Sequence, residues 1–190
     1  MKEPAIIIMM GRPGSGKGTQ AALLAKEFGL DSIRASQLLL KRGETPDYTG
    51  KKIVDTIGKG MLIPSTFVMN LMMKKFDEKK AKGIGNGFIL DGAPRKLFEA
   101  YMLQEALAWF GWNNVKLLNI VVSEKEAQER LSKRGRNDDD PEDIQVRFRL
   151  HTEQIEPALA YLKEQGTRID INGEQSEEEV HAEMKAKLEL

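Results

Sequence analysis

A glycine-rich segment directly after an apolar run constrains this chain more than any other feature. Residues 11–20 read GRPGSGKGTQ and follow the six apolar residues 5–10. Glycines allow successive backbone N–H groups to turn inward, and the first turn of a following helix points its unpaired donors and positive dipole end at the same place. Lys17 adds a charge for the outer phosphates, and Thr19 adds a hydroxyl for a magnesium ion. The segment therefore predicts a strand, a loop that binds the phosphates of a nucleoside triphosphate, and a helix.

The loop departs at one position from the general pattern G-x-x-x-x-G-K-[ST]. Gly11, Gly16 and Lys17 match the pattern, but Gly18 stands where Ser or Thr is usual. This variant is typical of small nucleotide kinases rather than GTPases, and the chain has no Asn-Lys-x-Asp motif for reading guanine. A GTPase switch is therefore disfavoured.

The charges of the chain balance, and it has no cysteine. Lys and Arg number 29, as do Asp and Glu, so no net field attracts nucleic acid or an anionic membrane. Without cysteine there is no disulfide framework and no thiolate zinc site. The N-terminal apolar run is too short for a signal peptide, and the run 115–122, which Asn119 interrupts, cannot span a bilayer. We expect a monomeric, cytoplasmic protein with no zinc, no nucleic acid and no membrane partner.

Strand-like and helix-like patterns alternate along the chain. The expected strands are residues 5–10, 32–33, 87–91, 115–122 and 168–172. The expected helices run from Lys17 to Gly29, through residues 100–110, from a cap at Ser123 to Gly135, from a cap at Asp140 past an interruption at Pro157, and from a cap at Ser176. Such alternation predicts a parallel sheet with helices on both faces and a ligand site beyond the carboxyl ends of the strands.

Three ring-bearing residues are expected to be structural. Trp109 and Trp112 are expected to pack in the core rather than to stack on a base. His151 falls on the apolar stripe of the helix that begins at Asp140 and is expected to be buried there.

Charged residues after the third expected strand, and in and after the helix that begins at Ser123, are further candidates for binding magnesium or phosphate. Asp91 ends an apolar strand and suits magnesium coordination, with a turn-forming Asp-Gly as the alternative. Arg95 follows Pro94 on a rigid turn, where its guanidinium suits the charge that develops in phosphoryl transfer. Arg130 and Arg134 share one helix face, for which a solvated basic surface is the alternative. The acids 138–140 are interpreted as a helix cap with ion pairs rather than a metal site.

Taken in order, these motifs resemble those of adenylate kinases, in the small nucleoside monophosphate kinase family, over essentially the whole chain. The resemblance is carried by the loop 11–20, by Asp-Gly-Ala-Pro-Arg at 91–95 (Asp-Gly-Phe-Pro-Arg in the family), by the arginines and acids of 130–139 followed by Arg147, and by the segment 58–64. It implies the α/β P-loop NTPase three-layer fold, with a five-stranded parallel sheet and helices on both faces. It also implies a magnesium-dependent reaction in which ATP phosphorylates a nucleoside monophosphate, with AMP as the usual acceptor.

The resemblance further implies one kinase domain, 1–190, with two inserts that close over the substrates. The core would comprise residues 1–33, 64–133 and 143–190. Residues 34–63 would form the monophosphate-binding insert, and residues 134–142 a short lid. The long, sometimes zinc-bearing lid has no room here and no cysteines to build it. Closure would exclude water from the γ-phosphate and prevent wasteful hydrolysis.

By the same resemblance, each part of the site receives its residues. The catalytic cations would be Lys17, Arg95, Arg134, Arg136 and Arg147. ATP would contact Gly14, Ser15, Gly16, Lys17, Gly18, Thr19, Arg130, Arg134 and Gln175. The monophosphate would contact Ala35, Leu40, Met61, Leu62, Ile63, Gly92, Ala93, Pro94, Arg95, Glu99, Arg136 and Arg147. Magnesium would be held, through water, by Thr19 and Asp91.

Two positions in the monophosphate pocket depart from the family pattern. Leu40 stands where the family has a phosphate-gripping arginine, and Lys41 or Arg42 is a candidate for the missing contact. Glu99 stands where the family has an adenine-reading glutamine, and an ionised carboxylate only accepts hydrogen bonds. Two alternatives to an AMP kinase therefore stay open at this point: a kinase for GMP, CMP or UMP, and a nucleotide-binding protein with little turnover.

Overall fold

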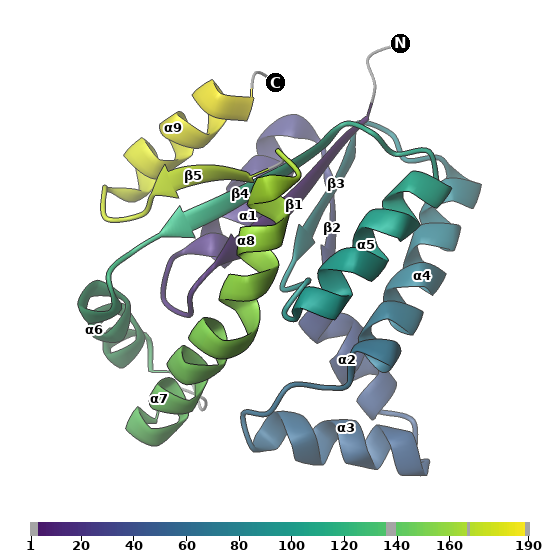
Figure 1. The fold of residues 1–190 in the computed structure, drawn as a ribbon, viewed down its shortest axis with the longest axis horizontal. Coiled ribbons are helices and arrows are strands. Elements are labelled where there is room, and N and C mark those ends of the chain that lie inside the picture. Colours follow the sequence, from purple (N-terminus) through teal and green to yellow (C-terminus); the bar gives the residue numbers. More distant parts are fainter. Residues whose placement is uncertain (1–3, 136–139, 167, 189–190) are drawn as a thin grey trace.

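The centre of the molecule is a parallel sheet, in a computed structural model that describes residues 4–135, 140–166 and 168–188. Its strands are β1 (Ala5–Gly11), β2 (Asp31–Arg34), β3 (Gly87–Asp91), β4 (Val115–Val121) and β5 (Arg168–Asn172). Five strands pair in the order β2-β3-β1-β4-β5, and each pairing is parallel (Figure 1). The predicted fold class is thus confirmed. The glycine-rich loop leaves the central strand of the sheet.

Helices cover the sheet on both faces. The α-helices are α1 (Lys17–Phe28), α2 (Ala35–Gly43), α3 (Tyr48–Gly58), α4 (Ser65–Lys82), α5 (Leu97–Trp109), α6 (Glu124–Arg134), α7 (Pro141–Leu150), α8 (Glu156–Glu164) and α9 (Glu177–Leu188). A π-helical turn, η1 (His151–Ile155), joins α7 to α8. In the described ranges, none of these helices is long and apolar enough to cross a membrane.

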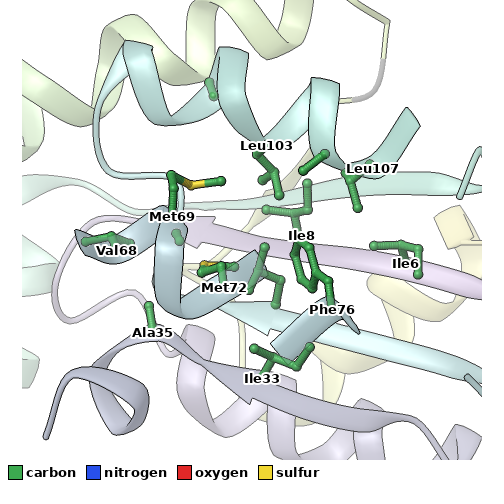
Figure 2. Packing of buried hydrophobic residues seen from close by; sticks show 14 of the residues in the cluster. Ile6, Ile8, Ile33, Ala35, Val68, Met69, Met72, Phe76, Leu103 and Leu107 are labelled. Atoms are coloured by element: carbon green, nitrogen blue, oxygen red, sulfur yellow. The ribbon is translucent and has the colours of Figure 1, made fainter. Parts of the chain in front are cut away.

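The central strand explains why the sheet has a helical layer on each side. Every residue of β1 is buried, so both of its faces need an apolar cover. Ile6 and Ile8 pack with α4, α5 and α8, where Figure 2 shows Phe76 and the methionines of α4 around them. Ile7 and Met9 face α1 and α9 on the opposite side. The result is a three-layer α/β domain.

The predicted helix ends agree closely with the structure. Gly29 ends α1 in a left-handed conformation, with φ of 62°. The hydroxyl of Ser123 accepts a hydrogen bond from the backbone N–H of Glu126, and the Asp140 carboxylate caps α7 at the N–H of Glu142. The expected interruption near Pro157 is also present, since the α-helical pattern gives way to η1 just before it.

One tryptophan lies where the sequence did not predict it. Trp112 is buried and stacks on Phe110, as expected for core packing. Trp109 is 82% exposed, so the expectation that it packs in the core was wrong. It is the last residue of α5, and the core-facing positions of that helix are taken by Leu103 and Leu107. Helical spacing therefore turns Trp109 outward.

Candidate active site

The glycine-rich loop forms an open cradle at the carboxyl end of β1. Gly14 has a φ of +84°, and a Cβ there would lie 2.5 Å from the carbonyl oxygen of Ala127 in α6. Only glycine fits this close approach. At Gly16 and Gly18, in contrast, a Cβ would meet nothing within 4 Å. The side of the loop at the start of α1 thus faces open space where an anion has room.

Ser15 and Thr19 present hydroxyls at the two ends of this cradle. The Ser15 hydroxyl is buried and has no hydrogen-bond partner in the described part of the chain. A buried hydroxyl without a partner costs free energy, which a ligand oxygen offsets. Thr19 is exposed on the first turn of α1. The loop therefore offers backbone and side-chain donors to a phosphate chain.

Lys17 lies where charges from three other elements converge. The pKa of its ammonium group is lowered to about 8, chiefly by loss of hydration; Asp91 opposes this shift, and the positive charges of Arg95, Arg147 and Arg134 add to it. These arginines come from the turn after β3, from α7 and from α6. Such mutual effects on the pKa require the groups to lie close together. The structure thus brings together four of the five predicted catalytic cations, and the fifth, Arg136, lies outside the described residues.

Glu99 supports the turn that carries Arg95. Its side chain is 2% exposed, and its Oε2 accepts a hydrogen bond of 2.7 Å from the backbone N–H of Arg95. The Arg95 Nε in turn donates to the carbonyl oxygen of Gly92 at 3.0 Å. The family pattern predicts that Glu99 reads the acceptor base. In the structure, one oxygen of its carboxylate also fixes the backbone of the turn that carries Arg95, a predicted catalytic cation.

The helices α2 and α3 hold the predicted monophosphate insert, and they lie together at one end of the molecule in Figure 1. Arg42 makes a two-pronged ion pair with Asp47, with Nη–Oδ distances of 3.1 and 2.9 Å. That carboxylate also accepts from the N–H of Gly50 at 2.7 Å. Arg42 is therefore committed to the turn between the helices and is no substitute for the arginine that Leu40 replaces. Leu40 itself is 54% exposed.

The remaining predicted monophosphate residues belong to two segments, the insert and the turn after β3. Ala35 is buried, and its Cβ lies 3.9 Å from the position of a Cβ on Gly92. Ile63 is buried, and its carbonyl oxygen accepts a hydrogen bond from Lys96. Met61 is 54% exposed, Leu62 is partly exposed, and Ala93 and Pro94 are buried.

Two of the predicted ATP contacts are Arg130, which lies on α6, and Gln175, which lies in the segment after β5. Arg130 pairs with Glu126 at 2.7 Å. Hydrogen bonds from Ser123 lower the pKa of the Glu174 carboxyl, and the nearby Arg130 charge adds to this effect. Gln175 follows Glu174 and donates to the carbonyl oxygen of Asn172. Arg130 and Gln175 are thus held on two neighbouring segments.

The Asp91 carboxylate and the Thr19 hydroxyl suit magnesium better than a metal that needs three or four protein ligands. Asp91 ends β3 and pairs in register with Met9 of β1, so its carboxylate lies at the edge from which the glycine-rich loop departs. The Thr19 hydroxyl is the second candidate. No group of three or more His, Cys, Asp or Glu that could hold a metal occurs within the described ranges. Magnesium keeps several waters and binds through one or two protein oxygens together with substrate phosphates, so these two residues fit it.

Sequence reasoning overlooked Arg12 in the loop. Its guanidinium lies 3.5 Å from the Glu124 carboxylate and 5.8 Å from the centre of the Phe148 ring. Arg12 thereby links the loop to α6 and α7. Its place between Gly11 and Pro13 was the only sequence signal, and it gave no indication of the partners.

An anion-binding loop that leaves a central parallel strand, with cations converging on its lysine, defines a P-loop nucleotide kinase. The family model described as "Adenylate kinase" matches residues 9–167. The chain therefore belongs to the adenylate kinase family, and it is a transferase.

Curated relatives from several bacteria agree with this assignment. An adenylate kinase of Parabacteroides distasonis is 37% identical over 186 residues, which cover 94% of this chain and 95% of the relative. Adenylate kinase 1 of Nostoc is 34% identical over 182 residues, covering 96% and 97%. An adenylate kinase of Mycobacterium tuberculosis is 33% identical over 171 residues, covering 90% and 93%. The predicted family is confirmed.

Proposed function

We propose that this chain transfers the γ-phosphoryl group of ATP to AMP, giving two molecules of ADP, with the residue roles described below. The observation that carries the proposal is the convergence of Lys17, Arg95, Arg134 and Arg147 around Asp91. A protein that only binds a nucleotide needs the loop and its lysine, but it has no need of three further cations. Phosphoryl transfer needs them, because charge spreads over the equatorial oxygens in the transition state.

Each group has a defined task in this proposal. The backbone N–H groups of the loop and Lys17 hold the β- and γ-phosphates of ATP. An oxygen of the AMP phosphate attacks the γ-phosphorus of ATP. The bond between that phosphorus and the β–γ bridging oxygen breaks, and this oxygen leaves with ADP. Arg95, Arg134 and Arg147 stabilise the negative charge on the transferred phosphoryl group. Arg136 joins them, by the family resemblance. Thr19 and Asp91 would hold magnesium through water, and the ion would supply positive charge that neutralises the phosphates.

The proposal includes closure of two segments and a simple assembly. The insert 34–63 and the lid 134–142 close over AMP and ATP and exclude water. Because the converging cations all come from one chain, we propose that a monomer is sufficient for catalysis. We place the enzyme in the cytoplasm, where adenine nucleotides are abundant.

AMP is preferred over other acceptors in this proposal for two reasons. The relatives are named adenylate kinases. In addition, the Glu99 carboxylate is buried and bonded to the Arg95 backbone, so it is not directed at a base as an acceptor. The case for guanine, which rested on that carboxylate, loses its basis.

A coupled assay for ADP tests the proposed reaction. With MgATP and purified protein, we expect ADP to form rapidly only after AMP is added. The values of kcat/KM for GMP, CMP and UMP should each be lower than the value for AMP by at least about tenfold, since each lacks hydrogen-bond groups that an adenine site pairs. Equal ADP production without AMP, or a higher kcat/KM for another monophosphate, would contradict the proposal.

The low pKa of Lys17 predicts a loss of activity in mildly alkaline solution. Loss of hydration lowers this pKa to about 8, well below the 10.5 of an exposed lysine. Only the protonated ammonium holds phosphate, and kcat/KM reports ionisations of the free enzyme. At saturating AMP, kcat/KM for MgATP should therefore be level below about pH 8 and then fall by up to about tenfold per pH unit.

Lys17→Arg provides the control for this profile, since a guanidinium stays charged across the whole range. We expect a lower but level kcat/KM for that variant. A wild-type profile that stays level to about pH 10 would contradict the assignment of the ionisation to Lys17.

Leu40→Arg should tighten the binding of AMP. The side chain is 54% exposed on α2, so the change disturbs no core contact. A charge-assisted hydrogen bond to the AMP phosphate contributes about 1.5–3 kcal/mol, so KM for AMP should fall by about tenfold or more. Leu40→Gln is the matched control and should leave this KM nearly unchanged. An unchanged KM in Leu40→Arg would mean that another group, such as Lys41, already holds that phosphate.

A further inference from the structure

A polar cavity lies beside the nucleotide loop, and none of its lining residues is among the predicted ATP and AMP contacts. Its volume is about 360 Å³, and its polar lining consists of Arg12, Asn119, His151, Glu156 and Arg168. These residues come from the loop after β1, from β4, from η1 and the start of α8, and from β5. The volume exceeds that of a few water molecules and falls in the range of sites for small ligands.

His151 is the strongest sign that this cavity is built for a polar ligand. The residue is 5% exposed, and neither ring nitrogen has a hydrogen-bond partner in the part of the chain that the structure describes. The nearest acid is Glu156, whose Oε1 lies 3.6 Å from Nδ1, beyond hydrogen-bond distance. The helix also changes to a π-helical turn at this residue, a rare feature that often marks functional sites.

The state of His151 defines what the ligand must offer. The pKa of the ring is lowered to about 4, chiefly by burial and in addition by the positive charges of Arg12 and Lys17. At neutral pH the ring is therefore uncharged, with one N–H donor and one nitrogen acceptor. Arg12 and Lys17 act on the ring with positive charge, while the Glu156 carboxylate lies 3.6 Å from Nδ1, so the cavity offers positive charge near Arg12 and an acceptor near Glu156.

The cations and acids of the cavity differ in exposure. The side chains of Arg12 and Arg168 are each 19% exposed, whereas that of Glu156, the acid in the lining, is 49% exposed. Asp170 accepts hydrogen bonds of 2.7 Å from both the Arg168 Nε and the Asn119 Nδ2, which fixes that guanidinium and that amide. The Glu156 carboxylate is thus better screened by water than the two guanidinium groups.

We propose that this cavity binds a small organic oxyanion with a hydroxyl group, as a site separate from those for ATP and AMP. The carboxylate or phosphate group accepts hydrogen bonds from Arg12, Arg168 and the His151 N–H. The hydroxyl donates to the Glu156 carboxylate at the rim.

Nuclear magnetic resonance of the two histidine rings tests this proposal in the whole protein. The active site is first filled with a bisubstrate inhibitor, two adenosines joined by five phosphates, so that added anions do not bind the loop. Citrate and glycerol 3-phosphate are then titrated separately, as probes for a carboxylate and a phosphate. We expect the ring signals of His151 to shift saturably with at least one probe, and the probe that acts identifies the anionic group.

His181 is the internal control in the same spectra. His181 lies on α9, away from the cavity. Its ring nitrogens lie 3.2 Å from the Gln20 side-chain oxygen and 2.6 Å from a Glu27 carboxylate oxygen, both on α1. Its signals should stay unchanged. A His151 signal that does not move, or that moves without saturation and together with that of His181, would overturn the proposal.

A pair of arginine variants locates the binding. Arg168→Gln removes one charge-assisted contact and should weaken binding of the active probe by about tenfold or more. Arg149→Gln, on the exposed side of α7, should leave the affinity within about twofold. Since Arg168 is outside the catalytic group, ADP production should be retained in both variants. Wild-type affinity in Arg168→Gln would show only adventitious binding and would overturn the proposal.

Discussion

Lys17→Met is expected to abolish phosphoryl transfer while the protein remains folded. Lys17 is the cation of the loop itself, and Arg95, Arg134 and Arg147 converge on it. Removal of one fixed cation from a transferred phosphoryl group costs about 10³-fold or more in kcat. The variant should be no less stable than the wild type, because burial already disfavours the charged form of this lysine.

Lys26→Met is the matched control for this prediction. Lys26 lies on the same helix, α1, but its side chain is exposed and distant from the loop. Both variants should melt near the wild-type temperature, and only Lys17→Met should lose ADP production from ATP and AMP. An activity of Lys17→Met within about tenfold of wild type would contradict the role given to this lysine.

Phe76→Ala is expected to cause the largest loss of stability among single changes in the core. Phe76 is fully buried in α4, and its ring centre lies 5.6, 5.9 and 5.4 Å from those of Phe88, Phe110 and Trp112. Truncation of such a ring leaves a cavity and costs about 3–5 kcal/mol in the free energy of unfolding. That cost is a large fraction of the stability of an ordinary domain, about 5–15 kcal/mol.

Urea unfolding followed by tryptophan fluorescence measures this loss. The background variant Trp109→Phe removes the exposed tryptophan, so that the buried Trp112 reports alone. Phe67→Ala is the control on the same helix, because Phe67 is 45% exposed, and it should cost less than about 1 kcal/mol. A loss in Phe76→Ala no greater than in Phe67→Ala would contradict the described core.

Local patterns were sufficient to predict most of the fold. The strand, loop and helix around Lys17 follow from glycine spacing and an apolar run. The central place of that strand in the sheet is seen only in the structure. Caps at Ser123 and Asp140 marked helix starts because their side chains bond to N–H groups within three residues. Such signals are readable in a sequence because both partners are close along the chain.

Side-chain partners that depend on the geometry of a turn or on tertiary packing could not be predicted from local patterns. The pairing of Arg42 with Asp47, although only five residues apart, depends on the angle between α2 and α3. The hydrogen bond from the Arg95 N–H to Glu99 changes a predicted base-reading residue into one that supports the turn. His151 was correctly expected to be buried, but its unpartnered nitrogens and the arginines beside it become visible only in three dimensions.

A crystal structure with the bisubstrate inhibitor, two adenosines joined by five phosphates, tests the central claim most directly. The claim is that cations from separate elements surround the phosphoryl group as it passes between two nucleotides. We expect Lys17, Arg95, Arg134 and Arg147 each to lie within hydrogen-bond distance of the phosphate chain, about 2.7–3.2 Å. If these side chains instead stand a water layer or more away from every phosphate, the account is contradicted.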